Sequence, residues 1–236
     1  MSDTWTMIWK ESKDELFQGS WQALTRPLLF IAILGIVFPL QAGMQWLDLS
    51  PVNMLIMIYF PFIFIINFIG DAIAGERERH TLETLLASRI SDRAILLGKV
   101  IVTVGYAWGM AFASLLLGLA SVNLMNGAGT WRFYASDHLL AALVLILLAT
   151  LLAASGGVLI SLRSATVRQA QQTLILSTLA LGVLSLLALK GVPASLISAL
   201  NYNQVLLIIM AILGVTDAIL LVLSMASFQR SRLILS

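Results

Sequence analysis

The residues best suited to recognising another molecule lie in one polar stretch from Gly75 to Val100, with the sequence GERERHTLETLLASRISDRAILLGKV. Leu82, Leu85 and Leu86 recur at helical spacing, which predicts a short helix with an apolar edge. The charged residues beside this edge are Glu76, Arg77, Glu78, Arg79 and Glu83. Mixed charge next to an apolar edge suits the docking of another protein, because such charges fix orientation and specificity. From spacing alone, a solvated loop whose leucines rest on the membrane is an equally good interpretation.

Nucleotide and metal chemistry find no support in the sequence. A phosphate-binding loop of the form G-x-x-x-x-G-K-[ST] is missing, because Gly98-Lys99 is followed by Val100. The chain has no cysteine and two histidines, His80 and His138, which fall on opposite sides of the membrane in the topology predicted below. We therefore expect this chain to bind no cofactor and no metal, and any ATP that drives it must be bound, with Mg²⁺, by another chain.

Serine-protease chemistry is also not expected. Ser155 lies in a run of small residues, Ala153 to Gly157, and a catalytic serine needs a base beside it. A membrane serine protease would place its histidine later in the chain, and none occurs after His138. We interpret the small residues as a surface that lets membrane helices approach closely.

Three polar residues lie inside apolar runs, where a charged side chain costs at least about 2.5 kcal/mol. Asp217 lies near the middle of the last run, and Asn67 and Asp71 lie four residues apart on one helix face. We expect such residues to face protein or water, which makes all three candidates for a substrate path. For Asp217, a protonated carboxyl group that is hydrogen-bonded to a neighbouring helix is an equally good interpretation. Asp71 is close to the end of its run and is expected to be in contact with water.

The elements that position these residues are expected to span a membrane. Of the 236 residues, 59% are hydrophobic and only 11% are charged, whereas soluble domains carry about 25% charged residues. Apolar runs of about 17–25 residues match the length of helix that crosses a hydrocarbon layer of about 30 Å. We predict an all-α membrane protein with six transmembrane helices: Pro27–Leu47, Val52–Ala74, Leu96–Leu124, Leu139–Leu162, Thr173–Leu189 and Val205–Phe228.

The basic residues predict the orientation of these helices. Arg132 and Lys190 fall on one side of the membrane. The other twelve of the 14 basic residues fall on the opposite side: Lys10, Lys13, Arg26, Arg77, Arg79, Arg89, Arg93, Lys99, Arg163, Arg168, Arg230 and Arg232. Because cytoplasmic segments carry the excess of Lys and Arg, the second side is predicted to be cytoplasmic, with both chain ends and the connection 75–95. The net charge of +2 is too small to indicate a nucleic-acid partner.

Residues 1–26 precede the first span and lack the basic start and apolar core of a signal peptide. We predict an amphipathic helix that lies along the cytoplasmic surface of the membrane, and the alternative is an ordinary solvated helix. Its predicted apolar side is Trp5, Ile8, Trp9, Leu16 and Phe17. The predicted domain organisation is this interfacial helix followed by one six-span domain, 27–236.

The polar stretch also carries a resemblance. It resembles the permease subunits of ABC type-2 exporters, which have a GE-(R/K)-E-x-G-TLE-x-LL-A motif after the second span and an ILLGK-like start to the third. The matching residues are Gly75, Glu76, Arg77, Glu78, Thr81, Leu82, Glu83, Leu85, Leu86, Ala87, Ile95, Leu96, Leu97, Gly98 and Lys99. The stretch Ile8 to Leu16 also resembles the opening helix of that family. His80 departs from the motif, since the family usually has Gly there, and Arg89 stands near a usual Pro.

The resemblance implies a function for the polar stretch. In that family it forms the coupling helix, which sits in a cleft of a separate cytoplasmic ATPase. The residues that would contact the ATPase are Glu76, Arg77, Glu78, Arg79, Thr81, Leu82, Glu83 and Leu86. The resemblance further implies two ATPase subunits, a second permease copy or homologue, and the inner membrane of a prokaryote. It also implies short re-entrant helices in the extracytoplasmic segment 190–204.

Three functions are compatible with the sequence. The first is the permease half of an ATP-driven exporter, and it explains the coupling-like stretch. The second is a stand-alone channel or ion-coupled transporter that uses Asp217. The third is a membrane scaffold. The apolar walls of the spans are compatible with lipids, hydrophobic drugs or peptides as substrates, and the intramembrane carboxylates leave ions open as well.

Overall fold

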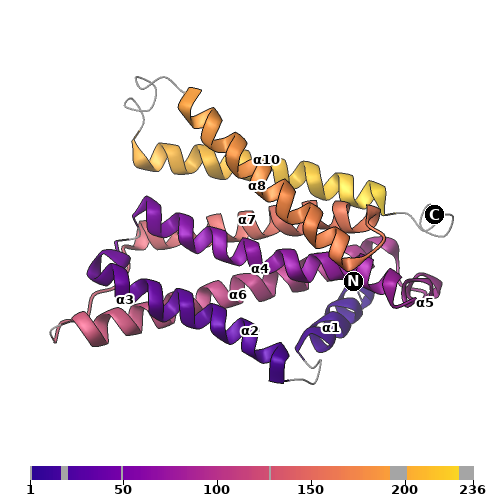
Figure 1. The fold of residues 1–236 in the computed structure, drawn as a ribbon, viewed down its shortest axis with the longest axis horizontal. Helices are drawn as coiled ribbons and strands as arrows, with labels where there is room; N and C mark the ends of the chain where they lie inside the picture. Colours follow the sequence, from indigo (N-terminus) through magenta and orange to yellow (C-terminus); the bar gives the residue numbers. More distant parts are fainter. Residues whose placement is uncertain (1, 17–20, 49, 128, 192–200, 229–236) are drawn as a thin grey trace. The chain divides into compact units, whose positions relative to one another are not determined.

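The computed structural model describes residues 2–16, 21–48, 50–127, 129–191 and 201–228 (Figure 1). All regular elements in these ranges are helices. In chain order they are α1 (Ser2–Leu16), α2 (Trp21–Ala32), η1 (Ile33–Val37), α3 (Phe38–Ala42), η2 (Gly43–Trp46), α4 (Pro51–Glu78), α5 (Leu82–Ala87), α6 (Asp92–Asn126), α7 (Ser136–Arg163), α8 (Val167–Gly191) and α10 (Tyr202–Ser227). The predicted all-α class is confirmed.

Five helical segments in the described residues are long and apolar enough to cross a membrane. They are Pro27–Trp46, Asn53–Glu78, Asp92–Asn126, Ser136–Arg163 and Asn203–Ser227. The predicted span Thr173–Leu189 is helical within α8, but α8 is not among the five segments, so the number six stays a prediction. Most of the predicted extracytoplasmic segment 190–204 lies outside the described residues.

The chain forms two compact units, each assembled from separate stretches of sequence. The first unit contains 1–65 and 93–151, and the second contains 66–92 and 152–236. In the first unit an aromatic cluster joins α2, α3, α4 and α6. Its ring contacts are Phe30–Phe60, Phe30–Phe64, Phe38–Phe60 and Phe64–Tyr106, with centroids 5.3–6.0 Å apart. The indole of Trp108 in α6 donates a hydrogen bond to the carbonyl oxygen of Leu143 in α7.

A π-helical turn interrupts the first span of this unit, and Pro39 explains its position. Proline has no amide hydrogen, so it cannot donate to the carbonyl oxygen of Gly35 four residues earlier. The amide of Phe38 instead donates to Ile33, five residues back, as in a π-helix. The carbonyl oxygen of Gly35 accepts a hydrogen bond of 2.9 Å from the hydroxyl of Ser121 in α6. The π-turn therefore supplies a main-chain acceptor that ties the first span to α6.

Helix α1 packs against the start of α6 in the first unit. Met7 is fully buried, and a Cβ atom on Gly98 would lie 2.6 Å from its Cγ, so this contact requires glycine. Glu11 lies one turn after Met7 in α1, and its carboxylate is 3.0 Å from the ammonium of Lys99 in α6. Trp5 and Trp9 are about two thirds exposed, which agrees with the predicted outer apolar side of this helix. Leu16 and Phe17, the other end of that side, lie outside the described side chains.

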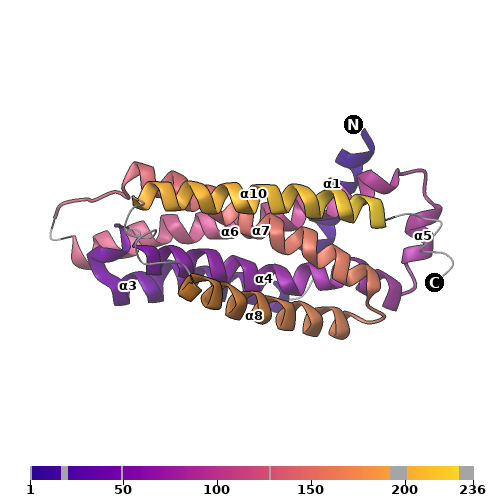
Figure 2. The same ribbon diagram turned by 90° about the horizontal axis from the view of Figure 1, so that it is seen from above.

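In the second unit, small residues of α7 provide the contacts between helices. A methyl group on Gly157 would overlap Ile69 of α4, so the two helices touch at this glycine. Figure 2 shows α7 and α10 from above. The hydroxyl of Ser224 in α10 donates a hydrogen bond of 3.0 Å to the carbonyl oxygen of Ser155 in α7. The prediction that the small residues from Ala153 to Gly157 form a packing surface is confirmed for Ser155 and Gly157.

Candidate functional site

The predicted docking stretch begins as the last turn of α4 and continues as α5, which Figure 1 shows beyond the end of α4. The sequence predicted that the second span ends at Ala74, but α4 continues to Glu78. The helix stops at His80, whose φ of 57° is left-handed. His80 N–H donates to Arg77 O, and Thr81 N–H donates to Glu76 O at 2.9 Å, which is the Schellman pattern of a helix end. The residue that departs from the family motif therefore occupies the position where a glycine is favoured.

Helix α5 turns its leucines inward. Leu82 and Leu85 are 7% and 8% exposed, whereas Glu83 and Thr84 between them are exposed. The expected apolar edge is present, but the chain itself covers it: a helix of six residues at the end of a span needs its leucines to hold it on the rest of the chain. The side chain of Leu86 lies outside the described part. The outward face of α5 is polar.

The ion pair between Asp71 and Arg79 crosses Gly75 on one face of α4. The guanidinium donates to both carboxylate oxygens, at 3.0 and 3.2 Å. This hydrogen-bonded carboxylate raises the pKa of Arg79. A Cβ atom on Gly75 would overlap the carboxylate, so the glycine of the motif makes room for the pair. Asp71 was predicted to line a substrate path and Arg79 to contact an ATPase, and the structure joins the two in an ion pair at the end of α4.

Arg77 and Glu78 reach the connection between α7 and α8. The guanidinium of Arg77 donates to the carbonyl oxygens of Ser164, at 2.7 Å, and Leu162, at 3.1 Å. The carboxylate of Glu78 accepts a hydrogen bond of 3.1 Å from the amide of Val167, the first residue of α8. Glu76, the preceding residue, is buried. Three of the residues predicted to contact a partner therefore make contacts inside, or are covered by, this chain.

Ser161 was not predicted, and it bridges two main-chain groups of α4. Its hydroxyl accepts a hydrogen bond of 3.0 Å from Ala74 N–H and donates one of 3.2 Å to Gly70 O. A regular helix would join these two groups directly. Ser161 is fully buried. One signal in the sequence could have indicated this contact. Ser161 is a small polar residue in an apolar run, four positions after Gly157, and therefore lies on the helix face that packs on α4.

Asp217 is 2% exposed and lies in α10, seven residues before Ser224. Neither of its carboxylate oxygens has a hydrogen-bond partner among the described residues. The interpretation of a carboxyl group hydrogen-bonded to a neighbouring helix is therefore not observed within this part of the chain. Asn67, the third predicted path residue, lies in α4, and its side chain is outside the described part.

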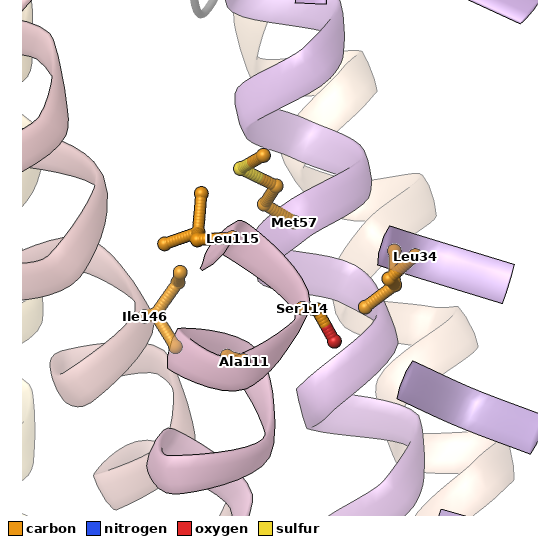
Figure 3. Close-up of a pocket in the computed structure, with 6 residues that line it drawn as sticks. All are labelled: Leu34, Met57, Ala111, Ser114, Leu115 and Ile146. Carbon is orange, nitrogen blue, oxygen red and sulfur yellow. The ribbon is translucent and has the colours of Figure 1, made fainter. Parts of the chain in front are cut away.

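A small cavity lies in the first unit, and Figure 3 shows the six residues that line it. They are Leu34, Met57, Ala111, Ser114, Leu115 and Ile146. Its volume of about 10 Å³ is at the lower limit for one water molecule. The hydroxyl of Ser114 donates to Met110 O within its own helix, so the walls offer a ligand little polar contact. The cavity is a packing defect beside the π-turn and is too small for a substrate.

Comparisons with known proteins concern the chain as a whole and not single residues of this site. The sequence profile described as ABC-2 family transporter protein matches residues 44–220, three quarters of the chain. The chain is also similar to the ABC transporter permease protein NatB of Bacillus subtilis (strain 168), with 34% identity over 107 residues. That match covers 43% of this chain and 27% of NatB, so it spans about a quarter of the relative's length.

Proposed function

Because the chain belongs to the ABC-2 family of transporter proteins, and is thus a multi-pass membrane subunit of an ABC transporter, we propose that it is the permease of an ATP-driven exporter. A separate ATPase would bind ATP and Mg²⁺ and dock on the outward face of α5. The full assembly would contain two ATPase subunits and two permeases, in the inner membrane of a prokaryote with both termini in the cytoplasm. The similarity to NatB, an ABC transporter permease protein, supports the assignment of the permease role to this chain and of ATP hydrolysis to another.

One observation carries the docking proposal, namely the way α5 is held. Leu82 and Leu85 fix its inner side, and the Schellman turn at His80 ties it to α4. Glu83 and Thr84 are left exposed on a short helix whose orientation is set by the chain itself. A pre-oriented polar surface loses little entropy on binding, and it suits repeated docking of a partner whose shape changes with its nucleotide.

The test is a charge reversal on this face. Glu83→Lys should lower permease-stimulated ATP hydrolysis and efflux at least tenfold in vesicles that contain the permease and its ATPase. Asp48→Lys is the matched control, because Asp48 is exposed and far from α5 in sequence, and it should leave both activities unchanged. The docking proposal fails if Glu83→Lys hydrolyses ATP and transports at the parent rate while it is folded and inserted.

A second function is favoured by one observation: the carboxylate of Asp217 is buried and has no hydrogen-bond partner among the residues that the structure describes. An ionisable group within a span is a default candidate for an ion or proton pathway. An ion-coupled transporter would move substrate in liposomes without any ATPase, driven by an imposed ion gradient. Flux that requires both the ATPase and ATP would exclude this alternative, and efflux into the lumen of inside-out vesicles would establish the direction of export.

A further inference from the structure

We propose that the α7–α8 connection moves as one body with α5. Two consecutive charged residues of the motif, Arg77 and Glu78, bind this connection through hydrogen bonds. These two residues are called the clamp below. The proposal rests on the proposed function in one respect, namely that an ATPase moves α5. The contacts of the clamp do not depend on that function, because they lie within this chain. It assigns Arg77 and Glu78 an internal positioning role in place of the contact with an ATPase that the family motif implies.

The first half of the clamp binds the end of α7. A helix ends with carbonyl oxygens that have no partner in the helix, and these oxygens carry partial negative charge. Arg77 donates to two of the carbonyl groups at this end, those of Leu162 and Ser164. The hydroxyl of Ser164 donates back to Ile160 O and closes the last turn. A guanidinium with two donors in a fixed plane is well suited to this pair of acceptors.

The second half of the clamp binds the start of α8, where unpaired amides carry partial positive charge. Thr166 caps this end, because its hydroxyl accepts a hydrogen bond of 3.2 Å from Gln169 N–H. The side-chain oxygen of Gln169 accepts one of 3.0 Å from Ala165 N–H. The carboxylate of Glu78 binds Val167 N–H. Each charge of the clamp therefore meets the helix end of opposite polarity.

The charges of Arg77 and Glu78 cannot be exchanged without loss of both contacts. With the two charges exchanged, a carboxylate would face the carbonyl oxygens of α7 and a guanidinium would face the amides of α8. Both contacts would become repulsive, although the net charge of the stretch would stay the same. The internal contacts therefore require the order arginine then glutamate. A surface that needed only mixed charge would tolerate either order.

Further contacts extend the clamp along α4. Ser161 bridges Gly70 and Ala74, within the two turns of α4 before the clamp, and Gly157 packs on Ile69. On the other side of the clamp, the amide and the hydroxyl of Thr81 both donate to Glu76 O, which ties the start of α5 to α4. The end of α4, α5, the end of α7 and the start of α8 are thus linked without a gap. A displacement of α5 reaches α7 and α8 directly, and not only through the chain into α6.

The test uses the absence of cysteine from the chain, which allows labels to be introduced at chosen sites. Ala87→Cys at the end of α5 and Arg168→Cys in the first turn of α8 place two spin labels on exposed positions. In detergent and without any ATPase, the label distance should be narrowly distributed in the parent. In Arg77→Ala/Glu78→Ala and in the exchange Arg77→Glu/Glu78→Arg, the distribution should broaden at least twofold. Arg163→Gln, which removes an exposed charge from the same connection, should leave it narrow.

This first measurement does not depend on the ATPase, so it separates the clamp from the proposed function. An unchanged distribution in the clamp variants would overturn the clamp. If these variants do not fold, Arg77→Lys replaces them, since lysine keeps the charge but loses the paired donors, and it should broaden the distribution to a smaller extent. With ATPase and a non-hydrolysable nucleotide added to the parent, the label distance should stay constant. A change of that distance on nucleotide binding would show that α5 and α8 move separately and would overturn the proposal.

Discussion

The buried ion pair between α1 and α6 allows a prediction whose size follows from the structure. Lys99 is 4% exposed and Glu11 13%, and the ammonium lies 3.0 Å from the carboxylate. Removing one member of a buried pair costs about 3–5 kcal/mol, because the other charge stays in a poorly solvated place. Glu11 keeps some exposure, and Lys10 Nζ lies 3.8 Å away. We therefore expect Lys99→Met to weaken the docking of α1 by about 3 kcal/mol.

Proteolysis measures this docking. At about 1.4 kcal/mol for each tenfold change, the undocked population of α1 should rise roughly 100-fold. Chymotrypsin cuts after tryptophan, and the exposed Trp5 and Trp9 provide sites in α1. Cleavage needs the helix to leave α6 and open locally, so its rate follows the open population when opening is fast. The rate of cleavage at these two sites, in detergent or in nanodiscs, should rise by a similar factor.

Two controls make the prediction sharp. Lys13→Met removes an exposed lysine from the same helix and should not change the rate. Glu11→Gln/Lys99→Met removes both charges and should recover most of the protection, because no buried charge is left behind. The reasoning is refuted if Lys99→Met is cut at the parent rate, or if the double variant is cut as fast as the single one.

The remaining predictions concern single positions in the helices. Gly75→Ala and Gly109→Ala both gain helix propensity, but only Gly109 has free space around it. Gly75→Ala should therefore be about 1 kcal/mol less stable than Gly109→Ala in thermal unfolding, as expected for loss of an exposed ion pair; equal stability would contradict the steric role of Gly75. His80→Gly removes left-handed strain and should raise the stability by up to about 1 kcal/mol, whereas His80→Val should lower the melting temperature. Asp217→Asn should reduce ATP-driven efflux at least tenfold without loss of assembly on size-exclusion chromatography; parent efflux would remove this residue from the substrate path.

The sequence predicted five of the spans and the short helix that follows the second one, because both depend on local patterns. Hydrophobic runs marked the five observed candidate spans to within a few residues, except where helices continue into charged sequence. The extension of α4 to Glu78 was missed because charged residues there were interpreted as solvated. Arg77 and Glu78 instead form hydrogen bonds with main-chain groups of α7, α8 and their connection, and Glu76 is buried. The spacing of Asp71, Gly75 and Arg79, four residues each, did carry a signal for the pair that crosses the glycine.

The clamp and the serine bridge could not be predicted in the same way. Arg77 and its acceptors in α7 are 85 and 87 residues apart, and Ser161 and Gly70 are 91 apart. No local pattern indicates which distant helix end a charge will meet. The inward turn of Leu82 was missed for a related reason, since the spacing of leucines defines an apolar edge but not whether the chain or a partner covers it.

The hydroxyl of Ser161 has a consequence for measurements on this protein. Amide hydrogen exchange in a helix ordinarily reports the opening of that helix alone. The amide of Ala74 in α4, however, is bonded to a side chain of α7, so its exchange depends on the contact between two helices. Separation of α7 from α4 would leave neighbouring amides of α4 protected and change the exchange of this one. The deuterium uptake of the Ala74 amide therefore reports, without any introduced side chain or probe, whether the two helices stay together during a transport cycle.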